Sequence, residues 1–116
     1  MKNSRVLIAV EAALVALELE LSLQQSGIET HSVGNVADAI RMIDAKQPDV
    51  AIIDSRLGSE DTLGIGRRLV SSNTRFLLLD DSGNTAADAH SGATVVIQKP
   101  VYAHEIVKHL ERLLSE

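Results

Sequence analysis

The feature that most constrains the fold of this chain is a regular alternation between short apolar runs and longer segments of helical composition or period. The apolar runs have the length of buried strands and lie at residues 6–10, 50–53, 76–79 and 94–97, and residues 28–33 are expected to form one more strand. A continuous apolar run is typical of a strand that is covered on both faces. Strands that alternate with helices in this way predict a parallel sheet with helices on both sides.

Helices are expected after each of the five strands. They are predicted at 12–25, from Asn35 to Pro48, from Asp61 through Val70, at 85–90, and around Ile106, Leu110 and Leu113. Asn35 and Asp61 are the expected capping residues of the second and third helices. Because crossovers between parallel strands are right-handed, few topologies remain. The favoured one is a (βα)5 flavodoxin-like, doubly wound five-stranded sheet of order 2-1-3-4-5, which forms a single domain over residues 1–116.

Composition excludes several classes of function. The 116 residues include 16 acidic and 11 basic side chains, a net charge of −5, so neither nucleic acid nor an anionic membrane surface is an expected partner. The absence of cysteine excludes disulfides and thiolate metal sites. No apolar run reaches the roughly 18 residues that a membrane span needs, and the apolar run near the start is too short for a signal peptide. A cytoplasmic domain is therefore expected.

Charged side chains follow four of the predicted strands at the point where each strand ends. They are Glu11, Asp54, Asp80, Asp81 and Lys99. Ligands of such sheets bind beyond the carboxyl ends of the strands, near the point where strand order reverses. Carboxylates gathered there repel one another unless a hard divalent cation neutralises them, and Mg²⁺ is the commonest choice. One carboxylate can then act as a nucleophile towards phosphorus, with the lysine pairing to the phosphoryl oxygens.

Three segments at these strand ends resemble one known family. They are V-L-I-A-V-E at 6–11, D-V-A-I-I-D-S-R-L-G at 49–58 and V-I-Q-K-P at 96–100. Together with the element pattern, they make the chain similar to the CheY-like receiver domains of two-component response regulators along essentially its whole length. The L-G-S-E-D segment at 57–61, the short fourth helix and the Q-K-P ending resemble an atypical subclass of that family.

The resemblance implies a role for each matching residue. Asp54 corresponds to the phospho-accepting aspartate, Lys99 to the family's lysine, and Glu11 to an acid that binds the metal. The backbone carbonyl of Arg56 corresponds to a further ligand of Mg²⁺. The Lys99–Pro100 bond is expected to be cis. Partners implied by the family are a sensor histidine kinase or histidine phosphotransfer protein, and a downstream protein target.

Three positions depart from the family pattern. Val10 stands where the first acid of the usual pair is found, Asp80 stands in place of the phosphoryl-binding hydroxyl, and Val96 replaces an aromatic residue. A carboxylate at Asp80 would repel an aspartyl phosphate. Two repairs remain open: Asp80 or Asp81 supplies the missing metal ligand, or a bulge brings the Ser82 hydroxyl to the phosphoryl group.

These observations favour a phosphoacceptor in a phosphorelay rather than an enzyme acting on a separate substrate. Phosphoryl transfer from a phosphohistidine to Asp54, assisted by Mg²⁺ and Lys99, is the first prediction. The alternative is a degenerate receiver that binds protein partners without phosphorylation, and the three departures favour it. A small Mg²⁺-dependent hydrolase is a third reading, for which no general base or substrate pocket can be identified.

Residues 12–25 carry apolar side chains on two opposite sides, whereas a surface helix needs one apolar face. The family register places Val15, Leu19 and Leu23 inward, which leaves Leu14, Leu17 and Leu21 as an exposed patch. This patch predicts a protein interface, with a homodimer as one form of it. The four histidines show no metal-ligand spacing and are expected at the surface. The Arg56 side chain either adds positive charge to the site or points to solvent.

Overall fold

A computed structural model describes residues 4–81 and 92–115 and contains a central five-stranded parallel sheet. Its strands, in chain order, are β1 (Arg5–Ala9), β2 (Glu29–Ser32), β3 (Val50–Asp54), β6 (Arg75–Asp80) and β7 (Val95–Gln98). They are arranged in the order β2-β1-β3-β6-β7, and every pair of neighbours is parallel. The predicted order 2-1-3-4-5 and the flavodoxin-like fold class are therefore confirmed.

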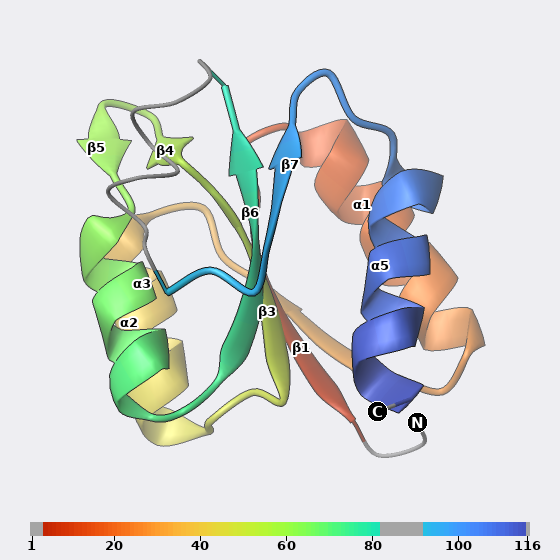
Figure 1. The fold of residues 1–116 in the computed structure, drawn as a ribbon, viewed down its shortest axis with the longest axis horizontal. Helices are drawn as coiled ribbons and strands as arrows, with labels where there is room; N and C mark the ends of the chain where they lie inside the picture. Colours follow the sequence, from red (N-terminus) through yellow and green to blue (C-terminus); the bar gives the residue numbers. More distant parts are fainter. Residues whose placement is uncertain (1–3, 82–91, 116) are drawn as a thin grey trace.

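Two helices cover each face of this sheet (Figure 1). The helices α1 (Ala13–Gln25) and α5 (Ala103–Ser115) pack side by side on one face, and α2 (Val36–Ala45) and α3 (Leu63–Ser71) pack together on the other. The short helix predicted at 85–90 lies outside the described residues. No helix in the described part of the chain is long and apolar enough to cross a membrane.

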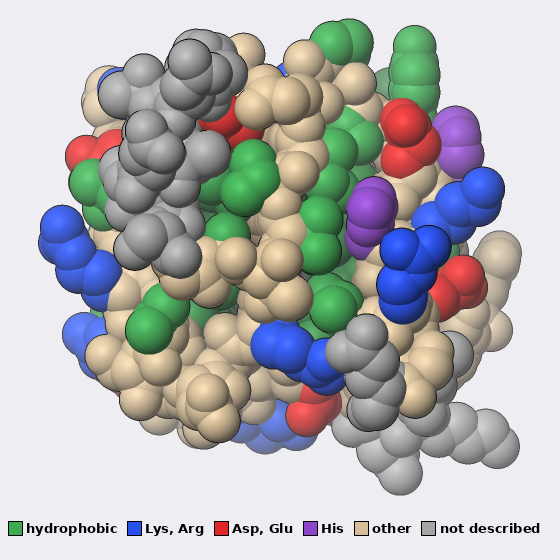
Figure 2. All heavy atoms as spheres, in the orientation of Figure 1, with side chains coloured by type: hydrophobic (Ala, Val, Ile, Leu, Met, Phe, Trp, Pro, Cys, Tyr) green, Lys and Arg blue, Asp and Glu red, His purple; other side chains and the backbone are tan. Residues whose placement is uncertain are grey.

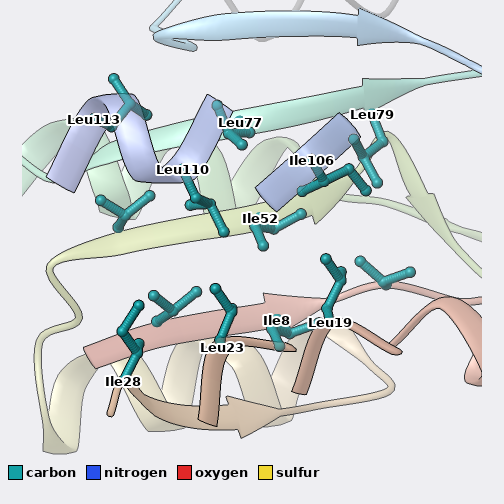
Figure 3. Packing of buried hydrophobic residues seen from close by; sticks show 13 residues of the cluster. Ile8, Leu19, Leu23, Ile28, Ile52, Leu77, Leu79, Ile106, Leu110 and Leu113 are labelled. Atoms are coloured by element: carbon teal, nitrogen blue, oxygen red, sulfur yellow. The ribbon is translucent and has the colours of Figure 1, made fainter. Parts of the chain in front are cut away.

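The apolar strands form the centre of two cores, one on each side of the sheet. Alternate residues of a strand point to opposite faces, so Ile52 packs toward α1 and α5 while Ile53 packs toward α2 and α3. Every residue of β3 is buried, as expected for the strand in the middle of a sheet that is covered on both faces. Figure 3 shows the first core, where Leu19 and Leu23 of α1 meet Ile8, and Ile106 and Leu110 of α5 lie over Ile52.

The helix caps agree closely with the sequence. The side chain of Asn35 accepts a hydrogen bond from the backbone N–H of Asp38, as an N-cap residue does. The capping residue of α3 is Thr62 rather than Asp61, but the Asp61 carboxylate still accepts a hydrogen bond from the Leu63 N–H at 3.0 Å. The predicted helix start is thus displaced by one residue, within the normal uncertainty of helix ends.

A small hairpin between β3 and α3 was not predicted. It pairs β4 (Arg56–Leu57) with β5 (Glu60–Asp61) in an antiparallel ladder. Gly58 turns the chain with φ of +63°, a conformation that glycine adopts without the steric penalty of a Cβ. The hairpin lies at the end of the sheet where β6 and β7 finish (Figure 1).

Strand β7 forms one edge of the sheet. Its residues alternate between half-buried and exposed, and Val96 is 39% exposed. Figure 2, drawn in the orientation of Figure 1, shows hydrophobic side chains gathered in a band between the two helix layers. The two edge strands, β2 and β7, consist of half-buried and exposed residues, whereas β3 and β6 are almost completely enclosed.

Candidate functional site

The predicted site is built around Asp54, the last residue of the central strand β3. Its side chain is only 1% exposed. The backbone N–H of Glu11 donates a hydrogen bond to Asp54 Oδ2 at 2.7 Å, and the Thr62 hydroxyl donates one to the Asp54 carbonyl oxygen at 2.6 Å. The turn after β1 and the start of α3 therefore hold this aspartate from both sides.

Lys99 brings the positive charge of the site. It directly follows β7, and its backbone N–H donates to the Asp80 carbonyl at 2.9 Å, which continues the β6–β7 ladder. The ammonium nitrogen lies 2.7 Å from Asp54 Oδ1 and 2.8 Å from Asp81 Oδ1. The bond between Lys99 and Pro100 is cis, which confirms the expectation from the family resemblance.

The electrostatics of the site favour a charged lysine. Burial opposes the charged form of Lys99, but hydrogen bonds and charge attraction from Asp54 and Asp81 outweigh burial and raise the lysine pKa above its ordinary value. Asp54 Oδ1 accepts no hydrogen bond of good geometry among the described residues, so its partner is the Lys99 ammonium. A buried carboxylate needs such a partner, because an unpaired buried charge is strongly destabilising.

Glu11 reaches the site mainly through its backbone. Its carboxylate accepts a hydrogen bond from the Gly58 N–H at 3.2 Å and so connects the end of β1 to the β4–β5 hairpin. The Arg56 side chain is exposed and donates to the Ser59 carbonyl at 2.7 Å. Of the two readings of Arg56, the structure favours the one in which the guanidinium lies at the surface of the hairpin.

Asp80 and Asp81 point to different surroundings although they are neighbours. Asp80 is completely buried and accepts a hydrogen bond from the Gln98 side chain at 3.1 Å. Asp81 is 45% exposed and forms the ion pair with Lys99. The carboxylates predicted at this site therefore have different partners. Asp54 and Asp81 both pair with Lys99, whereas Asp80 bonds to Gln98. Ser82, which belongs to the other predicted repair, lies outside the described residues.

A metal ion fits this site only with a reduced set of ligands. In the ranges 4–81 and 92–115, no group of three or more acidic or histidine side chains is arranged to hold a metal ion. The oxygen donors that the family resemblance assigns to the metal are the carboxylates of Asp54 and Glu11 and the backbone carbonyl of Arg56. This set suits a hard cation such as Mg²⁺, which commonly binds through one or two carboxylates and keeps several waters. Mg²⁺ at this site stays a prediction.

Two positioning residues could not have been identified from the sequence. Thr62 is fully buried, its hydroxyl bonds to the Asp54 carbonyl, and its N–H donates to the Ser55 carbonyl at 3.2 Å. Gly58 provides the N–H that holds Glu11. A glycine between a strand and a helix indicates a turn, but no sequence signal shows which carboxylate its N–H meets. The described histidines, His31, His104 and His109, are exposed or half-buried, and His90 lies outside the described residues.

The chemical capacity of the site follows from this arrangement. A carboxylate with one oxygen held by the Glu11 N–H, and with an ammonium 2.7 Å from the other oxygen, can attack an electrophile while the ammonium stabilises the charge of the incoming group.

The sequence of the chain matches a known protein family and two curated relatives. Residues 6–111 match the family described as the response regulator receiver domain. The virulence transcriptional regulatory protein PhoP of Salmonella typhimurium strain LT2 is 28% identical over 115 residues, which cover 95% of this chain and 51% of that protein. The transcriptional regulatory protein PhoP of Escherichia coli O6:H1 is 26% identical, with 95% and 52% covered. The chain thus spans about half the length of these curated relatives.

Solved structures agree in fold. A protein described as a response regulator from Chloroflexus aurantiacus superposes with a TM-score of 0.81 at 26% identity, covering 99% of this chain and all of that one. The non-phosphorylated HemR receiver domain from Leptospira biflexa superposes with a TM-score of 0.86 at 20% identity, covering 98% and 96%. With the family match extending over most of the chain, this protein belongs to the receiver domains of two-component response regulators.

Proposed function

We propose that Asp54 accepts a phosphoryl group from the phosphohistidine of a sensor histidine kinase or histidine phosphotransfer protein. The observation that carries this proposal is the contact of 2.7 Å between the Lys99 ammonium and the buried Asp54 carboxylate. In the transfer, the phosphorus–nitrogen bond of the donor breaks and a phosphorus–oxygen bond forms to Asp54. The imidazole nitrogen leaves with the electron pair. The chain is a phosphoacceptor in this reaction and not an enzyme with a separate substrate.

The described residues divide the work as follows. The Glu11 N–H holds Asp54 Oδ2, which orients the carboxylate for attack. The Lys99 ammonium moves from the carboxylate to the phosphoryl oxygens as negative charge builds up there. Mg²⁺, held by Asp54, Glu11 and the Arg56 carbonyl, would supply further neutralisation of the phosphoryl charge.

The first prediction tests the acceptor directly. Incubation of the protein with Mg²⁺ and acetyl phosphate should add the mass of one phosphoryl group, and intact mass spectrometry should show that the Asp54→Asn variant gains none. Asp44→Asn is the matched control, because Asp44 is an exposed aspartate on α2 that pairs with Arg68 at 2.6 Å, away from the site.

The proposal predicts that the Asp44→Asn control gains the phosphoryl group as the wild type does. Equal labelling of the wild type and Asp54→Asn would show that the modified residue lies elsewhere. Failure to label with acetyl phosphate, with phosphoramidate and with a phosphorylated histidine kinase domain would contradict the proposal.

A second candidate function is a phosphorylation-independent interaction module. Asp80, which the sequence aligns with the family's hydroxyl residue, is buried and bonded to Gln98, while Asp81 is the residue that meets Lys99. The 39% exposed Val96 takes the place of the family's aromatic residue. This chain therefore lacks both the hydroxyl residue and the aromatic residue that the family has at these two positions. The complete absence of labelling, with binding to a protein partner preserved in Asp54→Asn, would select this function.

The partner surface that the structure favours is the outer face of α1. Leu14, Leu17 and Leu21 are 70%, 49% and 54% exposed, whereas Leu19 and Leu23 on the same helix are buried, as the family register predicted. We propose that this leucine face binds another protein, and that a second copy of the chain is one occupant. Contiguous exposed apolar side chains are typical of interaction sites.

A further inference from the structure

The Lys99 ammonium is shared by two carboxylates of unequal burial. Asp54 is 1% exposed, whereas the Asp81 side chain is 45% exposed and the Lys99 side chain 32%. Both contacts are short, at 2.7 Å to Asp54 and 2.8 Å to Asp81. Two carboxylates are therefore paired with the ammonium before any ligand arrives.

The register of the sheet explains why Asp81, and not Asp80, meets this lysine. Asp80 is paired with Gln98 at the end of the β6–β7 ladder. The next residues of the two strands are Asp81 and Lys99, and successive side chains of a strand point to opposite faces. Asp80 and Gln98 accordingly bond to each other, while Asp81 and Lys99 pair on the face that carries the site. The pairing is thus a consequence of the strand register and not of a chance surface contact.

We infer that Asp81 competes with the incoming phosphoryl group for the Lys99 ammonium and so limits how readily Asp54 is phosphorylated. This inference rests on the proposed function of Asp54. A phosphoryl group bound to Asp54 needs the ammonium for its own oxygens, and the Asp81 carboxylate then lies close to a group of the same sign. Asp81 acts through Lys99 and does not touch the reacting atoms, so it is a positioning residue.

The experiment compares rates of Asp54 phosphorylation by acetyl phosphate, followed by intact mass at several donor concentrations. In each transfer the phosphorus–oxygen bond of the donor breaks, a new one forms to Asp54, and acetate leaves. Asp81→Asn removes the competing charge while keeping the side-chain shape. Asp81→Glu keeps the charge. Glu60→Gln, in β5, removes one exposed negative charge from a residue that is not part of the site.

The expected result is a rate about two- to fivefold higher for Asp81→Asn than for the wild type at low donor concentration, the range expected for loss of a partly exposed ion pair. Asp81→Glu and Glu60→Gln should remain near the wild-type rate. The advantage of Asp81→Asn should shrink as salt is raised to about 1 M, because salt screens charges that are exposed to solvent. A purely structural role of Asp81 would show no such dependence on salt. Circular dichroism verifies that all variants are folded.

Each outcome decides between the inference and the function on which it rests. If Asp81→Asn gains the phosphoryl group and the wild type does not, the inference is supported, because Asp81 then prevents phosphorylation of Asp54 completely. If the wild type is labelled and Asp81→Asn is no faster, or if Glu60→Gln is accelerated equally, the inference is overturned while the proposed function stands. If neither the wild type nor Asp81→Asn is labelled, both are overturned.

Discussion

At the scale of single residues, the charge balance of the site depends on Lys99. Its ammonium is the ion-pair partner of the buried Asp54 carboxylate, whose other oxygen is held by the Glu11 N–H. Replacement of Lys99 by glutamine should therefore lower the free energy of unfolding by about 2 kcal/mol near pH 8. This cost lies between the cost of breaking an exposed ion pair and that of breaking a buried one. In an Asp54→Asn background the same replacement should cost less than about 1 kcal/mol, because no buried charge is left unpaired.

This stabilisation by Lys99 should depend on pH with a definite sign. The folded chain raises the lysine pKa above its ordinary value of 10.5. A raised pKa means that the contribution is fully present below pH 10.5 and is lost as the pH rises through the folded value. Urea unfolding of the wild type and Lys99→Gln should converge in stability in strongly alkaline buffer. A stability difference that stays constant from neutral to alkaline pH would show that Lys99 acts through packing alone.

At the scale of elements, α1 differs from the other helices because it has an apolar outer face as well as an inner one. The helix carries Glu18 and Glu20 but no basic residue to shield its leucines. If the leucine face binds a second copy, sedimentation of the wild type should show an increase in average mass with concentration. The Leu17→Glu and Leu21→Glu variants should remain monomeric, because a buried unpaired charge disfavours association.

The matched control for these variants is Ala37→Glu, which adds the same charge to an exposed position on α2, on the other side of the sheet. It should associate as the wild type does. A wild type that stays monomeric at the highest accessible concentration would exclude the second copy as occupant and leave a different protein partner for this face.

At the scale of the whole molecule, the two cores share one sheet and should unfold together. Ile106 of α5 is buried in one core and Ile65 of α3 in the other. Each isoleucine-to-valine change should lower the free energy of unfolding by about 0.5–1.5 kcal/mol. The two effects should add to within about 0.5 kcal/mol, because the side chains lie on opposite faces and share no contact.

Urea unfolding followed by far-UV circular dichroism and by NMR should give coincident single transitions for the wild type, both single variants and the double variant. Leu14→Ala, at the most exposed of the α1 leucines, serves as the control and should change stability by less than about 0.5 kcal/mol. Two separate transitions, one for each core, would contradict the shared-sheet description.

The sequence by itself determined the architecture and the location of the site. Four apolar runs of strand length specify buried parallel strands, and the carboxyl ends of such strands necessarily meet at one edge of the sheet. This is why Asp54 and Lys99 were predicted as neighbours. The inward positions of α1 came from the family register instead, because the helix has apolar side chains on two opposite sides. The sequence also predicted the N-cap of α2, where the Asn35 side chain accepts a hydrogen bond from the Asp38 N–H.

Only the tertiary structure decided which charged groups face one another. The sequence places Asp80 and Asp81 at the same strand end, but the β6–β7 register directs Asp80 to Gln98 and Asp81 to Lys99. Likewise, the Glu11 carboxylate meets the Gly58 N–H only because an unpredicted hairpin approaches the end of β1. The physical reason is that apolar periodicity fixes which residues are buried, whereas side-chain partners depend on register and turn geometry between distant segments.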